Sequence, residues 1–325
     1  LLNALVRLPG CSPSIDIAAL LKTIKPVAGQ GGAAFNSKRQ FIEAQLAHRE
    51  GRHREAWQHL LEANRPMHAR YGARFNHDMK INVAVEEGVR AQRDRLTERR
   101  PDEPGQPVSL FILGPSRGGK STVEKLAGSL PGVSCGYENA MFENIIEQAF
   151  AKACVPQRQR LAHLPTDINE WIRQTYFEKI TERVGPSGVF TSTSPINIKN
   201  VARAAQTIPN SRFVFVKRNL DDITLRIFMS QYHGRNSYAY DIASMRKYLV
   251  WYYAMIDLFA DIYADISMVI DYEQTVESPE ETRRALTAFL GIQATDAPVP
   301  NLGDDRGCGL PYIKWIEEEL VRTDK

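Results

Sequence analysis

The spacing of apolar residues divides the chain into a helical first third and a mixed remainder. Apolar positions that recur every three to four residues predict helices over 41–51, 54–64 and 75–99. We expect the first two helices to meet at Gly51, because a glycine readily ends a helix in the left-handed conformation. Residues 1–35 are interrupted by prolines and glycines, so we expect no large core there.

Beyond residue 107, short apolar runs alternate with helical patterns, and this change follows a proline-rich segment. Residues 99–107 carry three prolines and one glycine, which mark the clearest domain boundary. We therefore predict a helical region over 1–100, a linker over 101–107 and a second domain over 108–325. In that domain we expect strands at 109–113, 133–135, 189–193, 212–217 and 267–271, and helices at 120–129, 141–153, 166–184, 198–207, 221–233, 242–264 and 279–290.

Alternating strands and helices predict an α/β fold, with a parallel sheet flanked by helices and preceded by the smaller all-α region. With 325 residues, 43% hydrophobic and 24% charged, the chain has the composition of a globular protein and not of a fibrous or disordered one. The net charge of +3 is spread over interleaved acids and bases, so we expect no nucleic-acid partner.

Two further features bear on the compartment. No apolar run approaches the ~20 residues that a membrane-spanning helix needs, so no transmembrane segment is expected. The four cysteines form no Cys-x-x-Cys pair, and we expect them to be free thiols in a reducing, cytoplasmic setting; they are Cys11, Cys135, Cys154 and Cys308.

A phosphate-loop pattern joins the first predicted strand to the next helix. Gly114, Gly119, Lys120 and Ser121 satisfy Gly-x-x-x-x-Gly-Lys-Ser. In such a loop, backbone N–H groups surround an anion at a helix N-terminus and the lysine adds a positive charge. The pattern indicates a P-loop-type sheet and a phosphate-type ligand; a glycine-rich turn that binds nothing is the alternative.

Ligands of parallel sheets gather at the carboxyl ends of the strands, so the residues that follow each strand matter. Glu138 follows the short second strand, and only uncharged hydroxyl side chains follow the third, at 192–194. Arg218 follows the fourth strand, close to where the phosphate loop should lie. A guanidinium there is suited to a second phosphate, although a simple pairing of Arg218 with an acid is also compatible with the sequence.

The N-terminal helical pattern suggests paired helices in close contact. Small or matching residues at Ala44, Gly51, Ala56, Leu60 and Ala63 resemble one tetratricopeptide unit. Because a single unit cannot bury its own face, it must dock on the next domain or end a longer array, and a protein partner is then possible.

Histidines crowd the same region and raise the question of a metal. Most of them stand beside charged or amide side chains, as on solvated helix faces, and we expect no metal site; they are His48, His53, His59, His68 and His77.

Four motifs together resemble a known family. The phosphate loop, the Gly-Tyr-Glu-Asn at 136–139, the Arg-x-x-x-Asp at 218–222 and the Asp-Tyr-Glu at 271–273 are similar to those of sulfotransferases that use 3'-phosphoadenosine 5'-phosphosulfate (PAPS). The resemblance covers about 108–292 and is strongest to bacterial types with an N-terminal tetratricopeptide region, akin to tyrosylprotein sulfotransferases. It implies sulfation of a hydroxyl acceptor, release of 3',5'-adenosine bisphosphate and no metal.

The resemblance also assigns site residues. Glu138, in Cys-Gly-Tyr-Glu, matches the catalytic base of the tyrosylprotein branch. Arg117 and Lys120 would stabilise the leaving phosphate, and Arg218 would bind the 3'-phosphate. The 5'-phosphosulfate would lie on the loop residues Pro115, Ser116, Arg117, Gly118, Gly119, Lys120, Ser121 and Thr122.

The chain departs from the family at two places. The serine that usually follows the 3'-phosphate arginine by eight residues is Arg226 here, with Ser230 one turn further on as a stand-in. The usual Asp-Lys-x-Pro-x-Asn segment lacks its lysine, which is replaced by Thr193. Lys120 could supply that charge from the loop; altered substrate choice or weakened or absent catalysis is equally compatible with the change.

Two other functions remain compatible with the sequence. The strict Gly-Lys-Ser loop also fits a small-molecule kinase or a nucleoside triphosphatase, for which Asp271 is the one candidate to hold Mg²⁺. A catalytically inactive, sulfotransferase-like interaction protein is the other alternative. The acceptor is not distinguished by the sequence: a glycan, a lipid-linked glycan, a peptide or a small molecule would each offer a hydroxyl.

Overall fold

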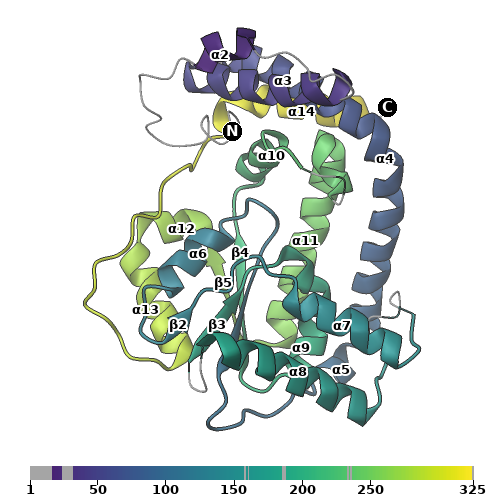
Figure 1. The fold of residues 1–325 in the computed structure, drawn as a ribbon, viewed down its shortest axis with the longest axis vertical. Helices are drawn as coiled ribbons and strands as arrows, with labels where there is room; N and C mark the ends of the chain where they lie inside the picture. The colour runs from purple at the N-terminus through teal and green to yellow at the C-terminus, as the bar shows by residue number, and fades with distance from the viewer. Residues whose placement is uncertain are drawn as a thin grey trace. The chain divides into compact units, whose positions relative to one another are not determined.

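The computed structural model describes residues 17–23, 32–156, 159, 161–184, 188–232, 234 and 236–323 (Figure 1). Predictions that concern 1–16 and 24–31, including the thiol of Cys11, lie outside the described residues. The chain forms two compact units, each of which is described by itself. Unit 1 comprises Leu1–Lys80, Leu220–Leu249 and Gly307–Lys325, and unit 2 comprises Ile81–Asn219 and Val250–Arg306.

Unit 2 contains a five-stranded parallel sheet in the order β2-β3-β1-β4-β5. The central strand β1 pairs with β3 on one side and with β4 on the other. This arrangement confirms the α/β fold class, and each predicted strand is present within two residues of its expected bounds. The strands are β1 (Val108–Leu113), β2 (Val133–Ser134), β3 (Val189–Ser192), β4 (Ser211–Lys217) and β5 (Ser267–Asp271).

The two faces of the sheet carry different side chains, because successive residues of a strand point to opposite sides. Leu110 and Ile112 of β1 lie in an aliphatic core with residues of α6 and α13. Phe111, on the other face, contacts Phe142 and Tyr176 at centroid distances of 5.3 and 6.3 Å.

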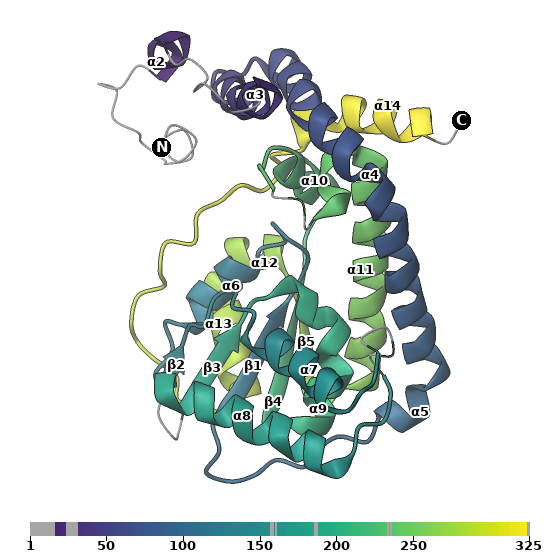
Figure 2. The same cartoon turned by 45° about the vertical axis from the view of Figure 1, so that its right-hand side comes forward.

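Helices therefore cover both faces of the sheet, as two views of unit 2 show (Figures 1 and 2). The first face is covered by α6 (Lys120–Ala127), α12 (Tyr272–Glu277) and α13 (Pro279–Leu290). The second is covered by α7 (Met141–Lys152), α8 (Thr166–Val184), η1 (Pro195–Asn200) and α9 (Val201–Thr207). The helix predicted at 198–207 is a 3-10 turn followed by an α-helix, with Pro195 at the first position of the turn.

The proline-rich segment before β1 is fixed to unit 2. Asn210, which has a left-handed backbone (φ 55°), accepts the N–H of Glu103 at 2.9 Å and donates to its carbonyl at 2.9 Å. Arg212 pairs with Asp102 at 2.8 Å. The predicted linker is thus an ordered connection to the edge where β4 begins, while the division into domains at 101–107 stays a prediction.

Unit 1 is helical and combines segments from both ends of the chain. Residues 65–74, which lay outside the predicted helices, belong to a single helix that continues through Pro66. The helix at 313–323 was not predicted at all. The elements of unit 1 are α2 (Ile17–Thr23), α3 (Gly32–Arg49), α10 (Leu220–Phe228), η2 (Ser237–Tyr240), η3 (Leu310–Tyr312), α14 (Ile313–Thr323) and the unit 1 parts of α4 (His53–Ala91) and α11 (Ile242–Ile262). The short helix α5 (Arg93–Leu96) belongs to unit 2.

The turn between α3 and α4 matches the predicted hinge. Gly51 has φ +74°, and Ala44, Ala56 and Ala63 are fully buried, as close helix packing requires. The assignment of these helices as a tetratricopeptide unit stays a prediction.

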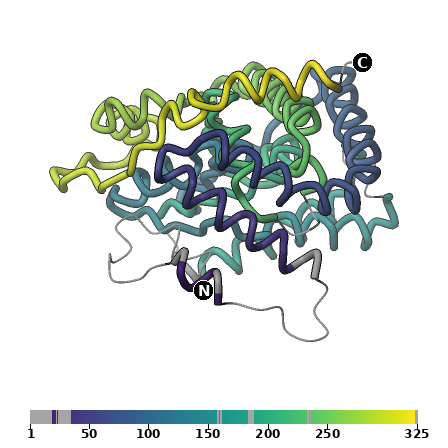
Figure 3. The backbone as a smooth tube through the Cα atoms, turned by 90° about the horizontal axis from the view of Figure 1, so that it is seen from above, coloured from purple at the N-terminus to yellow at the C-terminus, as the bar shows by residue number. Residues whose placement is uncertain are grey.

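The C-terminal segment packs against these N-terminal helices within unit 1 (Figure 3). The ring nitrogen Nδ1 of His48 lies 2.8 Å from the hydroxyl oxygen of Tyr312, and Nδ1 of His53 lies 3.3 Å from it. Trp57 stacks on Trp315 at 6.2 Å. His48 and His53 therefore have a hydrogen-bond partner in Tyr312. Burial lowers the pKa of His48, with the nearby His53 and Arg226 adding to the shift.

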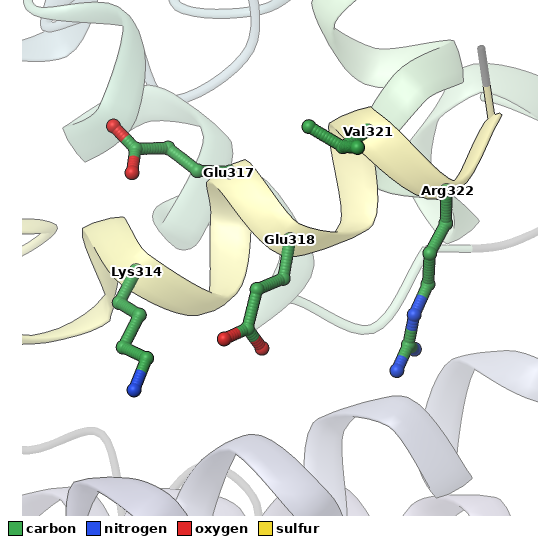
Figure 4. Close-up of a pocket in the computed structure, with 5 residues that line it drawn as sticks. All are labelled: Lys314, Glu317, Glu318, Val321 and Arg322. Atoms are coloured by element: carbon green, nitrogen blue, oxygen red, sulfur yellow. The ribbon is translucent and has the colours of Figure 1, made fainter.

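A surface cavity of about 370 Å³ is lined by charged residues of α14 with Val321 among them; the residues are Lys314, Glu317, Glu318, Val321 and Arg322 (Figure 4). No helix in the described part of the chain is both long and apolar enough to cross a bilayer.

Candidate functional site

The phosphate loop makes a tight turn that requires glycine at two of its positions. Arg117 (φ 62°) and Gly119 (φ 93°) are both left-handed. A Cβ atom on Gly114 would lie 2.8 Å from the carbonyl oxygen of Val216, and one on Gly119 would lie 2.4 Å from the ring of Tyr272. The loop thus turns sharply between β1 and α6, and its concave backbone at the start of α6 fits an anion.

Lys120 is buried beneath this loop, with 3% of its side chain exposed. Its ammonium donates a hydrogen bond to the carbonyl of Pro115 at 2.9 Å and lies 3.5 Å from a carboxylate oxygen of Glu138. Burial lowers the pKa of Lys120, and the charge of Glu138 partly opposes this shift. The structure therefore brings together two residues that the sequence placed in one site, a buried cation and an acid that is 57% exposed.

The turn that carries Glu138 is held by a residue that the sequence analysis missed. The carboxylate of Glu124, fully buried on α6, accepts the backbone N–H of Tyr137 at 3.0 Å and the hydroxyl of Thr191. Glu124 stands four residues after Lys120, on the same side of the helix. An acid at that spacing inside an apolar helix was the available signal for its role.

Tyr137 itself is strained and exposed. Its φ of 57° is uncommon for a bulky residue, and 68% of its surface is open to solvent. The N–H of Thr193 donates to its carbonyl oxygen at 3.1 Å. Thr193, which replaces the family lysine, therefore lies at the Tyr137–Glu138 turn, and its buried hydroxyl has no hydrogen-bond partner among the described residues.

Arg218 lies beside the phosphate loop, as predicted, but its guanidinium is covered. Only 3% of the side chain is exposed. One terminal nitrogen donates to the carbonyl of Arg117 at 3.3 Å, and the other pairs with the carboxylate of Asp305 at 3.0 Å and donates to its carbonyl at 2.9 Å. The guanidinium also stands 4.2 Å from the ring centroid of Tyr272. The alternative pairing with an acid is thus present, inside the site rather than on the surface.

Three groups fix the position of Arg218. The hydroxyl of Tyr253 accepts the N–H of Arg218 at 2.8 Å and donates to its carbonyl at 2.5 Å. The hydroxyl of Tyr272 donates to the carboxylate of Asp305. Burial raises the pKa of Tyr272 to about 12, and the negative charge and hydrogen bond of Asp305 contribute to this shift. The sequence analysis did not place Asp305 or Tyr272 among the ligand-binding residues, although Tyr272 lies in the Asp-Tyr-Glu motif.

Arg226 and Ser230 belong to unit 1, at the end of α10 and just beyond it. The buried hydroxyl of Ser230 donates to the carbonyl of Arg226 at 2.7 Å. Their predicted contact with the second phosphate stays a prediction.

The strand ends also bear on the kinase alternative. Both neighbours of β1 end without a carboxylate: β3 runs into Ser192 and Thr193, and β4 runs into Arg218. Asp271 ends β5, which is an edge strand and is not paired with β1. Among the described residues, the site thus combines a sharply turned loop with the buried side chains of Lys120 and Arg218 and the exposed carboxylate of Glu138.

Comparison with known proteins agrees with this picture. The chain is 26% identical over 224 residues to a protein-tyrosine sulfotransferase of Drosophila melanogaster, over 66% of this chain and 44% of that protein. It is 22% identical over 224 residues to protein-tyrosine sulfotransferase 1 of Danio rerio, over 66% of this chain and 62% of that protein. The match thus spans less than two thirds of either relative.

The solved structures that resemble this chain include a sulfotransferase from Alicyclobacillus acidocaldarius. The two chains are 19% identical with a TM-score of 0.41, and the match covers 70% of this chain and 95% of that one. A model of the sulfotransferase family matches residues 107–296, which is more than half of the sequence and includes the phosphate loop, Glu138 and Arg218. The chain therefore belongs to the sulfotransferase family.

Proposed function

We propose that the protein transfers a sulfuryl group from PAPS to a hydroxyl acceptor, with Glu138 as the general base. The observation that carries this proposal is the 3.5 Å approach of Glu138 to Lys120 at the mouth of the phosphate loop. A proton acceptor and a cation for the leaving group then stand at one point, which is what an in-line transfer requires.

The chemistry divides between these side chains. Glu138 takes the proton of the acceptor hydroxyl as the acceptor oxygen forms its bond to sulfur. The bond between sulfur and the donor's phosphate oxygen breaks, and its electrons remain on that oxygen. Lys120 and Arg117 stabilise the charge that develops there, and the backbone N–H groups of 116–122 hold the same phosphate. General base catalysis by Glu138 would contribute ~10²–10⁴-fold.

Two cationic side chains at neighbouring strand ends support a donor that carries two separate phosphates. Lys120 lies under the loop and Arg218 lies at the neighbouring strand end, joined to the loop by its bond to the Arg117 carbonyl at 3.3 Å. We assign the 5'-phosphosulfate to the loop and the 3'-phosphate to Arg218. Arg226 and Ser230 are further candidates for the 3'-phosphate.

The acceptor to test first comes from the relatives, and the compartment comes from the cysteines. The curated relatives are named for protein tyrosine, so a tyrosine peptide is the first acceptor to test, before glycans, lipid-linked glycans and small phenols. The three described cysteines are free, which supports a reducing, cytoplasmic compartment. The α3–α4 pair, as a tetratricopeptide-like unit, is the candidate site for a protein partner.

Binding tests the donor. Isothermal calorimetry should show that the protein binds 3',5'-adenosine bisphosphate more tightly than ATP with Mg²⁺. A preference for ATP with Mg²⁺ would overturn the proposal in favour of the kinase or triphosphatase alternative.

Turnover tests the base. With PAPS as donor and a panel of hydroxyl acceptors, including water, Glu138→Gln should bind 3',5'-adenosine bisphosphate normally but release it at least ~100-fold more slowly from PAPS. Glu182→Gln, an exposed change on α8, serves as the control and should match the wild type. Unchanged turnover in Glu138→Gln would remove Glu138 from the role of base.

A further inference from the structure

One of the two terminal nitrogens of the Arg218 guanidinium is engaged by an acid of the same chain. Asp305 supplies two oxygens to one terminal nitrogen of the guanidinium, its carboxylate at 3.0 Å and its backbone carbonyl at 2.9 Å. The ring of Tyr272 stands 4.2 Å from the guanidinium carbon. Since 3% of the Arg218 side chain is exposed, these contacts leave little open surface on it.

An incoming phosphate and the Asp305 carboxylate cannot both use that nitrogen. A phosphate oxygen at hydrogen-bond distance from it would have to occupy the space of the carboxylate oxygen. Two anions brought so close in a partly buried place repel each other strongly. The carboxylate must therefore move before a phosphate can use that nitrogen of Arg218.

The stretch that carries Asp305 lies outside the sheet, just beyond Leu302, which packs against the core. Residues 292–305 form no helix or strand, and Gly303 gives the segment a left-handed turn (φ 71°). The carboxylate of Asp305 is 32% exposed, so it can be released toward solvent. The Tyr272 hydroxyl, which donates a hydrogen bond to this carboxylate, also has to release it.

We propose that Asp305 is an internal competitor for the second phosphate of the nucleotide, and that its displacement from Arg218 limits the affinity of the protein for that ligand. This inference rests on the proposed function for the identity of the ligand. Asp305 thereby determines how strongly a nucleotide with a 3'-phosphate binds, without touching the group that is transferred.

The test compares two charge-neutralising changes one residue apart. Asp305→Asn keeps the shape of the side chain but removes its charge at Arg218. Asp304→Asn removes the same charge from the neighbouring residue, whose ion pair is with Arg306 at 2.9 Å. Any effect of overall charge on anion binding appears in both variants, so the difference between them reports on the competition.

The expected result is selective for the 3'-phosphate. By calorimetry, Asp305→Asn should bind 3',5'-adenosine bisphosphate about 10-fold more tightly than the wild type, and Asp304→Asn should bind it as the wild type does. The affinity for 5'-AMP, which has no group for Arg218, should be unchanged in both variants. Tyr272→Phe, which releases the carboxylate while keeping the aromatic ring, gives a second route to the same gain if Asp305→Asn folds poorly.

The outcomes separate this inference from the proposed function. If the wild type binds 3',5'-adenosine bisphosphate and folded Asp305→Asn binds it no better, Asp305 is not a competitor, and the proposed function stands. If the wild type fails to bind and Asp305→Asn binds, the competitor role is supported in its strongest form. If neither variant nor wild type binds the bisphosphate, both the inference and the assigned donor are wrong.

Discussion

The carboxylate of Glu124 accepts the backbone N–H of Tyr137 at 3.0 Å, so the helix that begins at the phosphate loop also holds the turn with the candidate base. One helix thus fixes both the loop and Glu138. A change at Glu124 should therefore affect turnover without touching the ligand directly.

Glu124→Ala removes both hydrogen bonds of this carboxylate and leaves the Tyr137 N–H and the Thr191 hydroxyl without it. We expect a loss of about 2 kcal/mol in the free energy of unfolding and at least a ~10-fold fall in kcat. Affinity for 3',5'-adenosine bisphosphate should stay within about twofold of the wild type. Glu124→Gln, whose amide oxygen can still accept both bonds, should restore most of kcat. Equal kcat in the wild type and Glu124→Ala would contradict this positioning role.

Lys120 should make ligand binding depend on pH. Burial places its pKa below the ordinary value of 10.5, and an anion favours the charged lysine. The Kd for 3',5'-adenosine bisphosphate should therefore be flat while Lys120 is protonated and should rise with pH in a window that begins below 10.5. Lys120→Gln should bind roughly 10- to 100-fold more weakly and lack that rise. Calorimetry across the alkaline range checks both, and an identical slope in the variant would exclude Lys120 as its source.

Alanine variants of Gly119 and Gly132 distinguish the effect of a strained backbone from that of a steric clash. Both have positive φ, but a Cβ on Gly119 would strike the Tyr272 ring at 2.4 Å, whereas one on Gly132 would meet nothing within 4 Å. Gly132→Ala should cost about 1 kcal/mol of stability and leave nucleotide binding intact. Gly119→Ala should also weaken nucleotide binding at least ~10-fold, because Tyr272 must shift. Denaturant unfolding and calorimetry on both variants test this, and equal ligand affinities would refute it.

The partly buried His48 should make the stability of unit 1 sensitive to acid. Its pKa is lowered by burial and by the neighbouring His53, Arg226 and Arg49 side chains. The unfolded chain then binds more protons than the folded one below the ordinary pKa of 6.5, so stability should fall as the pH drops through that region and be fully regained above it. Urea unfolding of His48→Gln should show a smaller loss on acidification than the wild type. His68→Gln, at an exposed site on α4, should keep the full loss.

The sequence predicted the sheet and the phosphate loop because both depend on local patterns. Apolar runs bounded by glycine and proline mark the strands, and the Gly-Lys-Ser motif fixes the loop. The approach of Glu138 to Lys120 and of Arg218 to the loop also followed, since parallel strands end at the same edge of a sheet.

The partners of these residues could not be predicted in the same way. Asp305 reaches Arg218 across 87 positions of chain, from a glycine-rich tail with no periodic pattern. The helix α14 was missed although its sequence is amphipathic. The roles of the site residues, the acceptor and the division at 101–107 remain predictions.

The way in which the chain alternates between its two units limits how such a protein can be rearranged by gene fusion. It passes from one unit to the other after Lys80, Asn219, Leu249 and Arg306. Neither unit is therefore a contiguous cassette: a truncation at the proline-rich segment removes α3 and the whole of α4 but leaves α10 and α14, with Phe228 and Tyr312 deprived of their partner Trp57. The helical and sheet parts have to be inherited, expressed and engineered together.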